Sequence, residues 1–140
     1  MDIDPKSKRA MENMFFEGIV SSQDAASGTV RVTRPDKNDK VTGPMVVGMR
    51  GTKDTKDFWM PAIGDQVLCL QLPNFSGKGV GEGWVLAARY SNVDASVESD
   101  PAVRSVHYAD GSYIKNSGGA IEIHASSSIK LTAPNIYINE

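Results

Sequence analysis

The C-terminal part of the chain repeats a short strand pattern that a single chain cannot bury. Pairs of aliphatic residues, each split by one residue, recur along it: Ile121 and Ile123, Ile129 and Leu131, and Ile136 and Ile138. Together with Ile114, the first members of the pairs are spaced by seven, eight and seven residues, which indicates an internal repeat of very short strands and turns. Two apolar side chains per strand cannot offset the entropy lost when the backbone becomes ordered. We therefore predict that these six residues face an axis shared by several copies of the chain.

The residues inside and beside these pairs are polar. Glu122 and Lys130 separate the members of two pairs, so a strand would point them outward to water, where charge discourages edge-to-edge aggregation. His124 follows Ile123 directly and is expected to face outward for the same reason. We predict that residues 103–140 form an intertwined β-structure that exists only in the oligomer.

Ahead of this tail the sequence has the patterns of a small β-barrel. Asp4 and Pro5 form a helix-start signal, and we expect a short helix over residues 5–13 within an N-terminal helix or arm of residues 1–14. Five strand-like segments joined by turn-like or charged stretches then follow, at 17–22, 29–35, 43–49, 64–73 and 83–91. Five short antiparallel strands predict a closed barrel over residues 15–90, for which the oligonucleotide/oligosaccharide-binding (OB) barrel is the commonest fit. Residues 91–102 are polar, and this composition predicts a linker.

Two of these strands are apolar on both faces, which is unusual for a barrel in water. The segment 67–70 supplies Leu68 and Leu70, and the segment 84–88 supplies Trp84 and Leu86. Continuous apolar runs indicate that both faces are covered, by a partner chain or by the N-terminal helix. We place these four residues, together with Trp59, in the barrel core or in a subunit interface.

Composition and motifs argue against catalysis and against nucleic-acid binding. The 140 residues carry a net charge of -2, without the basic excess of a nucleic-acid binder. Cys69 is the only cysteine, so no intrachain disulfide can form, and it lies in an apolar strand where a thiol is inert. The glycine-rich segment 77–83 lacks the Lys-Ser/Thr ending of a phosphate loop and predicts a hairpin loop. No secretory signal or membrane-spanning run is expected, and we expect no enzyme activity, no cofactor and no metal.

Several segments resemble the baseplate assembly protein V family, the central spike of contractile phage tails and related bacteriocins. The resemblance rests on MENMFFEGIVSSQDAASGTVRV, FWMPAIGDQVLCLQLPN, GWVLAARYSN and VRSVHYADGSYI, which together span most of residues 11 to 140. It implies an all-β homotrimer in which OB-like barrels are followed by a triple-stranded β-helix, or β-prism, over residues 103–140. Members of this family pierce membranes mechanically and are not enzymes. Some carry an H-x-H motif that binds iron at the tip, whereas this chain has only His107 and His124, which are far apart in sequence.

The same resemblance implies where such a chain would work and with what. The location is the virion, in the tail baseplate of a particle assembled in the host cytoplasm. The partners are a tail hub protein at the barrel end, the host envelope during piercing, and no nucleic acid. Because the prism is expected to end bluntly near Ile136 and Ile138, a small tip cap of the PAAR type is expected to cover its C-terminal end.

One alternative remains open from the residues themselves. An oligomeric OB barrel could bind nucleic acid or glycan through Trp59 and Trp84, with the tail serving as an oligomerisation stalk. The acidic balance and the absence of a stripe of basic and aromatic residues count against this alternative. For a third alternative, an enzyme, the sequence offers no catalytic residues.

Overall fold

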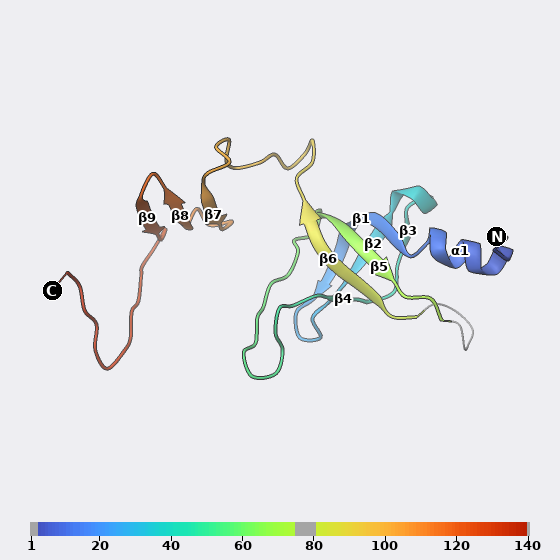
Figure 1. Cartoon of the computed structure of the whole chain (residues 1–140), viewed down its shortest axis with the longest axis horizontal. Helices are drawn as coiled ribbons and strands as arrows, with labels where there is room; N and C mark the ends of the chain where they lie inside the picture. The colour runs from blue at the N-terminus through green and yellow to red at the C-terminus, as the bar shows by residue number, and fades with distance from the viewer. Residues whose placement is uncertain (1–2, 75–80, 140) are drawn as a thin grey trace. The chain divides into compact units, whose positions relative to one another are not determined.

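The computed structural model describes residues 3–74 and 81–139 and divides the chain into two compact units, Met1–Ala95 and Ser96–Glu140 (Figure 1). The boundary falls within the segment that we expected to be a linker. The described residues are mostly β-structure, with a closed barrel in the first unit and a small sheet in the second. Residues 77–80 of the expected glycine-rich hairpin, 77–83, lie outside the described residues.

A single α-helix precedes the barrel. Helix α1 spans Pro5–Glu12, close to the predicted 5–13. One carboxylate oxygen of Asp4 accepts hydrogen bonds from the backbone N–H groups of Lys6 and Ser7, at 3.1 and 3.0 Å. This cap satisfies two of the N–H groups that a helix start leaves without partners, which explains why the helix begins where the sequence predicts.

The barrel closes through five strands in the order β1–β2–β4–β6–β5–β1. A two-residue strand, β3, pairs antiparallel with the end of β2 and was not predicted. We predicted antiparallel strands throughout, but β4 and β6 run parallel, which the 18-residue connection 48–65 allows by carrying the chain across the barrel. The strands are β1 Phe15–Asp24, β2 Thr29–Arg34, β3 Lys40–Val41, β4 Met45–Val47, β5 Gln66–Gln71 and β6 Gly83–Arg89.

Small aliphatic side chains fill the barrel interior. Alternate residues of each strand point inward, and Val32, Val67, Cys69 and Val85 are completely buried. The backbone at Gly18 approaches β2 so closely that a Cβ there would overlap the side chain of Val32. Glycine at this position therefore lets β1 and β2 come together over a tightly packed core.

The second unit contains a three-stranded antiparallel sheet in which β8 is central. Strand β7 spans Arg104–His107, β8 spans Tyr113–Ser117 and β9 spans Ala120–His124. The predicted turn at Asp110 and Gly111 joins β7 to β8, with Gly111 at a φ of +91°. Gly118 and Gly119 join β8 to β9 with positive φ at both positions, the two-residue turn that suits the twist of a hairpin.

Candidate functional site: exposed apolar surfaces

The sheet of the second unit has one face that is apolar and exposed. Val106 lies opposite Ile114, and Ile114 lies opposite Ile123, so the three side chains form a row across β7, β8 and β9. Ile121 lies on the same side of β9. The exposed fractions of Val106, Ile114, Ile121 and Ile123 are 54%, 45%, 74% and 60%. We call these four residues the β7–β9 apolar face.

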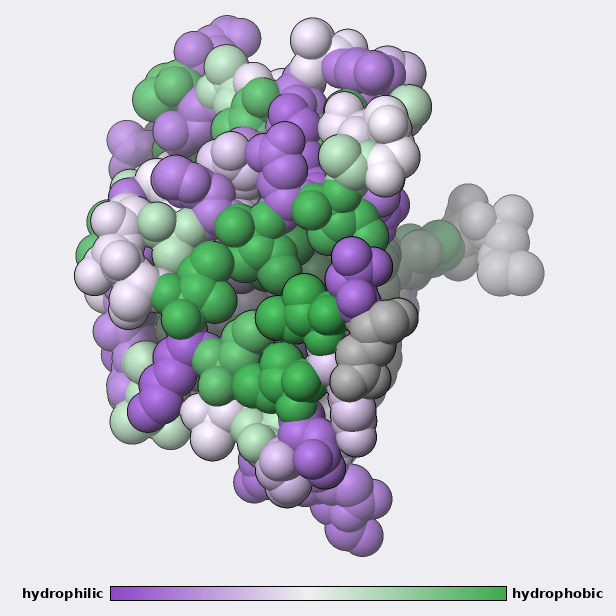
Figure 2. All heavy atoms as spheres, turned by 90° about the vertical axis from the view of Figure 1, so that its left-hand side faces the viewer, coloured by the Kyte–Doolittle hydropathy of each residue, from purple (hydrophilic) through white to green (hydrophobic). Residues whose placement is uncertain are grey.

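The remaining predicted axis residues follow β9 in a segment that forms no strand within one chain. Ile129, Leu131, Ile136 and Ile138 are between 51% and 79% exposed. Figure 2 looks at the left-hand side of Figure 1, where β7–β9 and this segment lie, and shows apolar side chains gathered into one exposed patch. The structure thus brings Ile121 and Ile123 together with Ile114, and it adds Val106, which we had not predicted. Val106 is the one aliphatic residue of the segment RSVH, so no pair of aliphatic residues marked it in the sequence.

The opposite face of the sheet is polar and carries a row of three neighbouring rings. The ring centroids of His107 and Tyr113 are 5.4 Å apart, and those of Tyr113 and His124 are 5.1 Å apart with nearly parallel planes. The Tyr113 hydroxyl donates a hydrogen bond of 3.1 Å to Glu122, and this bond is the main reason why the pKa of Tyr113 is raised. His124 therefore lies on the face opposite Ile123, as predicted from the alternation.

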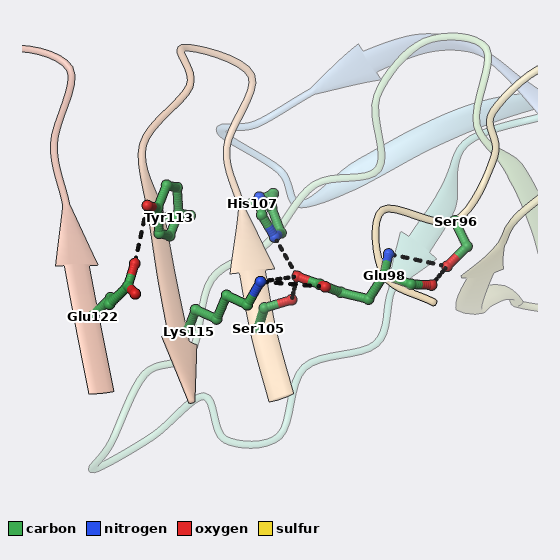
Figure 3. A network of polar contacts seen from close by, with 7 residues as sticks. All are labelled: Ser96, Glu98, Ser105, His107, Tyr113, Lys115 and Glu122. Carbon is green, nitrogen blue, oxygen red and sulfur yellow. Dashed lines mark hydrogen bonds and ion pairs between the residues drawn. The ribbon is translucent and has the colours of Figure 1, made fainter. Parts of the chain in front are cut away.

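Glu98 ties the chain ahead of β7 to this polar face (Figure 3). Its carboxylate accepts a hydrogen bond from the Ser105 hydroxyl at 3.2 Å and lies 3.1 Å from Nε2 of His107. Nζ of Lys115 approaches the same carboxylate at 3.4 Å. The hydrogen bond to His107, followed by that to Lys115, lowers the pKa of Glu98. These contacts hold Glu98 against the polar face of the sheet. The four aliphatic side chains of the β7–β9 apolar face remain exposed.

The first unit also exposes apolar side chains, on the outside of the barrel. Phe15, Leu70 and Trp84 lie opposite one another across β1, β5 and β6. Phe15 is 58% exposed, and Leu68 and Leu86, further along the same outer surface, are 41% and 42% exposed.

The structure therefore places four of the five predicted barrel residues outside the core. Leu68, Leu70, Trp84 and Leu86 are not part of it, because the alternation of β5 and β6 gives the interior to Val67, Cys69 and Val85. Trp59 packs against the core from a loop, and its indole N–H donates to the Gly48 carbonyl at 2.8 Å. The subunit interface remains as the predicted role for the four outer residues.

Among the described residues, little suggests reaction chemistry. No three His, Cys, Asp or Glu side chains are grouped so that they could hold a metal ion. Burial raises the pKa of the Cys69 thiol to about 12, so it does not supply a thiolate at neutral pH. No described helix is long and apolar enough to cross a membrane. Neither the models of known protein families nor the curated proteins give a match to this chain.

Proposed function

We propose that this protein is the trimeric central spike of a contractile tail baseplate. In this proposal the first unit is an OB-like barrel that attaches to the tail hub, and the second unit winds with two other copies into a triple-stranded β-helix. The spike is a structural part of a virion that pierces the host envelope and does not catalyse a reaction. The family resemblance in the sequence motivates the proposal, and the structural features below support it.

The observation that carries the proposal is the β7–β9 apolar face. Its four aliphatic residues are between 45% and 74% exposed in one chain. On the opposite face, by contrast, the side chains of Glu98, Tyr113 and Glu122 take part in hydrogen bonds within the chain. A contiguous exposed apolar surface of this kind marks an interaction site. Repetition of the same pattern through residues 129–138 favours other copies of the chain as the partner, because each copy then covers the apolar pairs of the others.

The barrel adds independent support. Its closed order of five strands, with one parallel pair between β4 and β6, is consistent with the OB-like barrel of this proposal. The apolar outer surface of β1, β5 and β6 provides a place for contacts between barrels or with the hub. Ile136 and Ile138, which are 51% and 79% exposed, are the residues that a PAAR-type tip cap would cover in the assembled particle.

Measuring the mass of the purified chain in solution tests the proposal. Light scattering or native mass spectrometry is expected to give three times the mass of one chain at micromolar concentration. Residues 103–140 are expected to be protected from proteolysis in this species, because cross-chain pairing covers their backbone. A folded, stable monomer under these conditions would contradict the proposal.

A further inference from the structure

The aliphatic side of the second unit's sheet also carries two polar side chains. Arg104 lies two residues before Val106 in β7, and Asn116 lies two residues after Ile114 in β8, so alternation points both toward the side of the β7–β9 apolar face. The register places Arg104 directly opposite Asn116, and Asn116 directly opposite Ile121. A cation and an amide therefore lie side by side on a surface that is otherwise aliphatic along these three strands.

Neither polar side chain has a partner among the residues that the structure describes. Arg104 and Asn116 are exposed, and no hydrogen bond or ion pair joins the guanidinium or the side-chain amide to another described residue. Lys115, on the polar side of β8, is by contrast ion-paired with Glu98. Within the described strands of this unit, Arg104 is thus the cation whose charge is not matched inside the chain.

The acidic residues of the described part of this unit are engaged elsewhere. Glu98 and Glu122 contact the polar side of the sheet (Figure 3). Asp100 and Asp110 each accept a hydrogen bond of 2.9 Å from the backbone N–H two residues further on, and neither forms an ion pair with Arg104. The sheet therefore contributes positive charge and no carboxylate to the side that we assign to the trimer axis.

Burial of this cation in an oligomer requires a counter-charge. In the proposed trimer the three aliphatic sides meet around one axis, and threefold symmetry brings three copies of Arg104 to the same level, each with an Asn116 beside it. Like charges that are shielded from water repel one another strongly and are tolerated only when they are paired. Guanidinium and amide N–H groups are hydrogen-bond donors, and arginine binds the oxygens of phosphate-like anions two at a time.

We propose that the trimer binds one tetrahedral oxyanion, phosphate or sulfate, on its axis between the three Arg104 side chains. The inference rests on the proposed function, because the site is incomplete without the other two copies. Each guanidinium donates to the anion's oxygens, and the Asn116 amides donate from the neighbouring strand. A doubly charged oxyanion offsets more of the positive charge than a halide ion does, which favours it as the ligand.

Equilibrium dialysis of the full-length trimer against radioactive inorganic phosphate tests this site. The chain is refolded in phosphate-free buffer, and its mass in solution is measured before dialysis. We expect one phosphate for every three chains, a ratio that distinguishes an axial site from a site on each chain. Arg104→Gln removes the charge and is expected to weaken phosphate binding by about tenfold or more. Arg50→Gln is the matched control, since Arg50 is 93% exposed on the first unit, and it should leave binding unchanged.

A second variant keeps the test decisive if Arg104→Gln alters assembly. Asn116→Asp adds a carboxylate beside each guanidinium, so that the chain itself supplies the counter-charge. This variant is expected to remain a trimer without phosphate and to lose its phosphate binding. Phosphate binding equal to that of the wild-type chain would contradict the proposed site.

The outcomes separate this inference from the proposed function. A trimer that binds no phosphate, binds three phosphates, or binds phosphate as well after Arg104→Gln as before overturns the inference and leaves the trimer standing. The first of these results is also what a carboxylate from a neighbouring copy, such as Asp100, would produce if it matched Arg104. A folded monomer removes both the inference and the proposed function.

Discussion

Ile114 and Ile123 lie opposite each other on one side of the sheet formed by β8 and β9, while Tyr113 and His124 stack at 5.1 Å on the other side. The two pairs are adjacent in sequence, so strict alternation alone separates them. One side carries the hydrogen bonds and the rings of Tyr113 and His124, and the other carries the aliphatic side chains of the β7–β9 apolar face. This division makes it possible to test the two faces separately.

A charge placed on the apolar face should prevent trimer formation. Ile123→Asp would put three carboxylates in the water-excluded core of the proposed prism, at a cost of several kcal/mol for each buried, unpaired charge. Ala120→Asp is the matched control, because it adds the same charge to the same strand on the polar face. Light scattering should give a trimer for the control and smaller species for Ile123→Asp. Equal masses for the two variants would contradict the assignment of the faces.

Acid should weaken the second unit through Glu98. Because the folded-state pKa of this carboxyl is lowered from 4.5, its contribution to stability is fully present above about pH 4.5 and is lost as the pH falls through the folded-state value. Glu98→Gln is therefore expected to lower Tm at pH 7 and to reduce the further decline on acidification. Thermal melting followed by circular dichroism between pH 7 and pH 3 measures both effects.

A second carboxylate on the same sheet provides the control for Glu98. Glu122 accepts a hydrogen bond from Tyr113, whereas Glu98 contacts Ser105, His107 and Lys115. Glu122→Gln should consequently lower Tm at pH 7 less than Glu98→Gln does, because it disrupts one hydrogen bond and not contacts with three residues. If Glu98→Gln retained the full acid dependence of the wild-type chain, the role assigned to Glu98 would be wrong.

The sequence was informative where a pattern depends on neighbouring residues. Period-two alternation predicted the five barrel strands, and the Asp4–Pro5 signal predicted α1, because alternation and helix capping are determined locally. The expected turn at Asp110 and Gly111 was confirmed, since positive φ at glycine is also a local property. The opposite faces of Ile123 and His124 followed from the same reasoning.

Contacts between distant segments could not be predicted in this way. Nothing local in the sequence showed that Val47 would pair in parallel with Val85, or that Glu98 would reach Lys115 across the sheet. The bulge between β5 and β6 at Leu68 and Cys69 similarly depends on how two strands meet. The outward position of Leu68 and Trp84 was ambiguous for a related reason: a strand that is apolar on both faces does not reveal which face is inside.

Cys69 should be unreactive in the folded protein. Burial leaves its side chain without solvent exposure and raises the pKa of the thiol to about 12, so almost no thiolate exists at pH 8. We expect a disulfide-exchange reagent to react with none of the thiol in the native chain and with one equivalent in guanidinium chloride. Rapid reaction under native conditions would show that the barrel opens around β5, or that Cys69 lies outside its core.

Gly18 should be among the least replaceable residues of the barrel. A methyl group there would overlap the fully buried side chain of Val32 and would lie 2.8 Å from the Thr33 carbonyl oxygen. Because strands β1 and β2 must separate to accommodate it, Gly18→Ala is expected to lower the free energy of unfolding by about 1–3 kcal/mol. Gly43→Ala is the matched control, since a Cβ at Gly43 has no atom within 4 Å. Urea unfolding of the two variants measures the difference. A Gly18→Ala chain as stable as the Gly43→Ala chain would mean that β1 and β2 are not packed as closely as the structure places them.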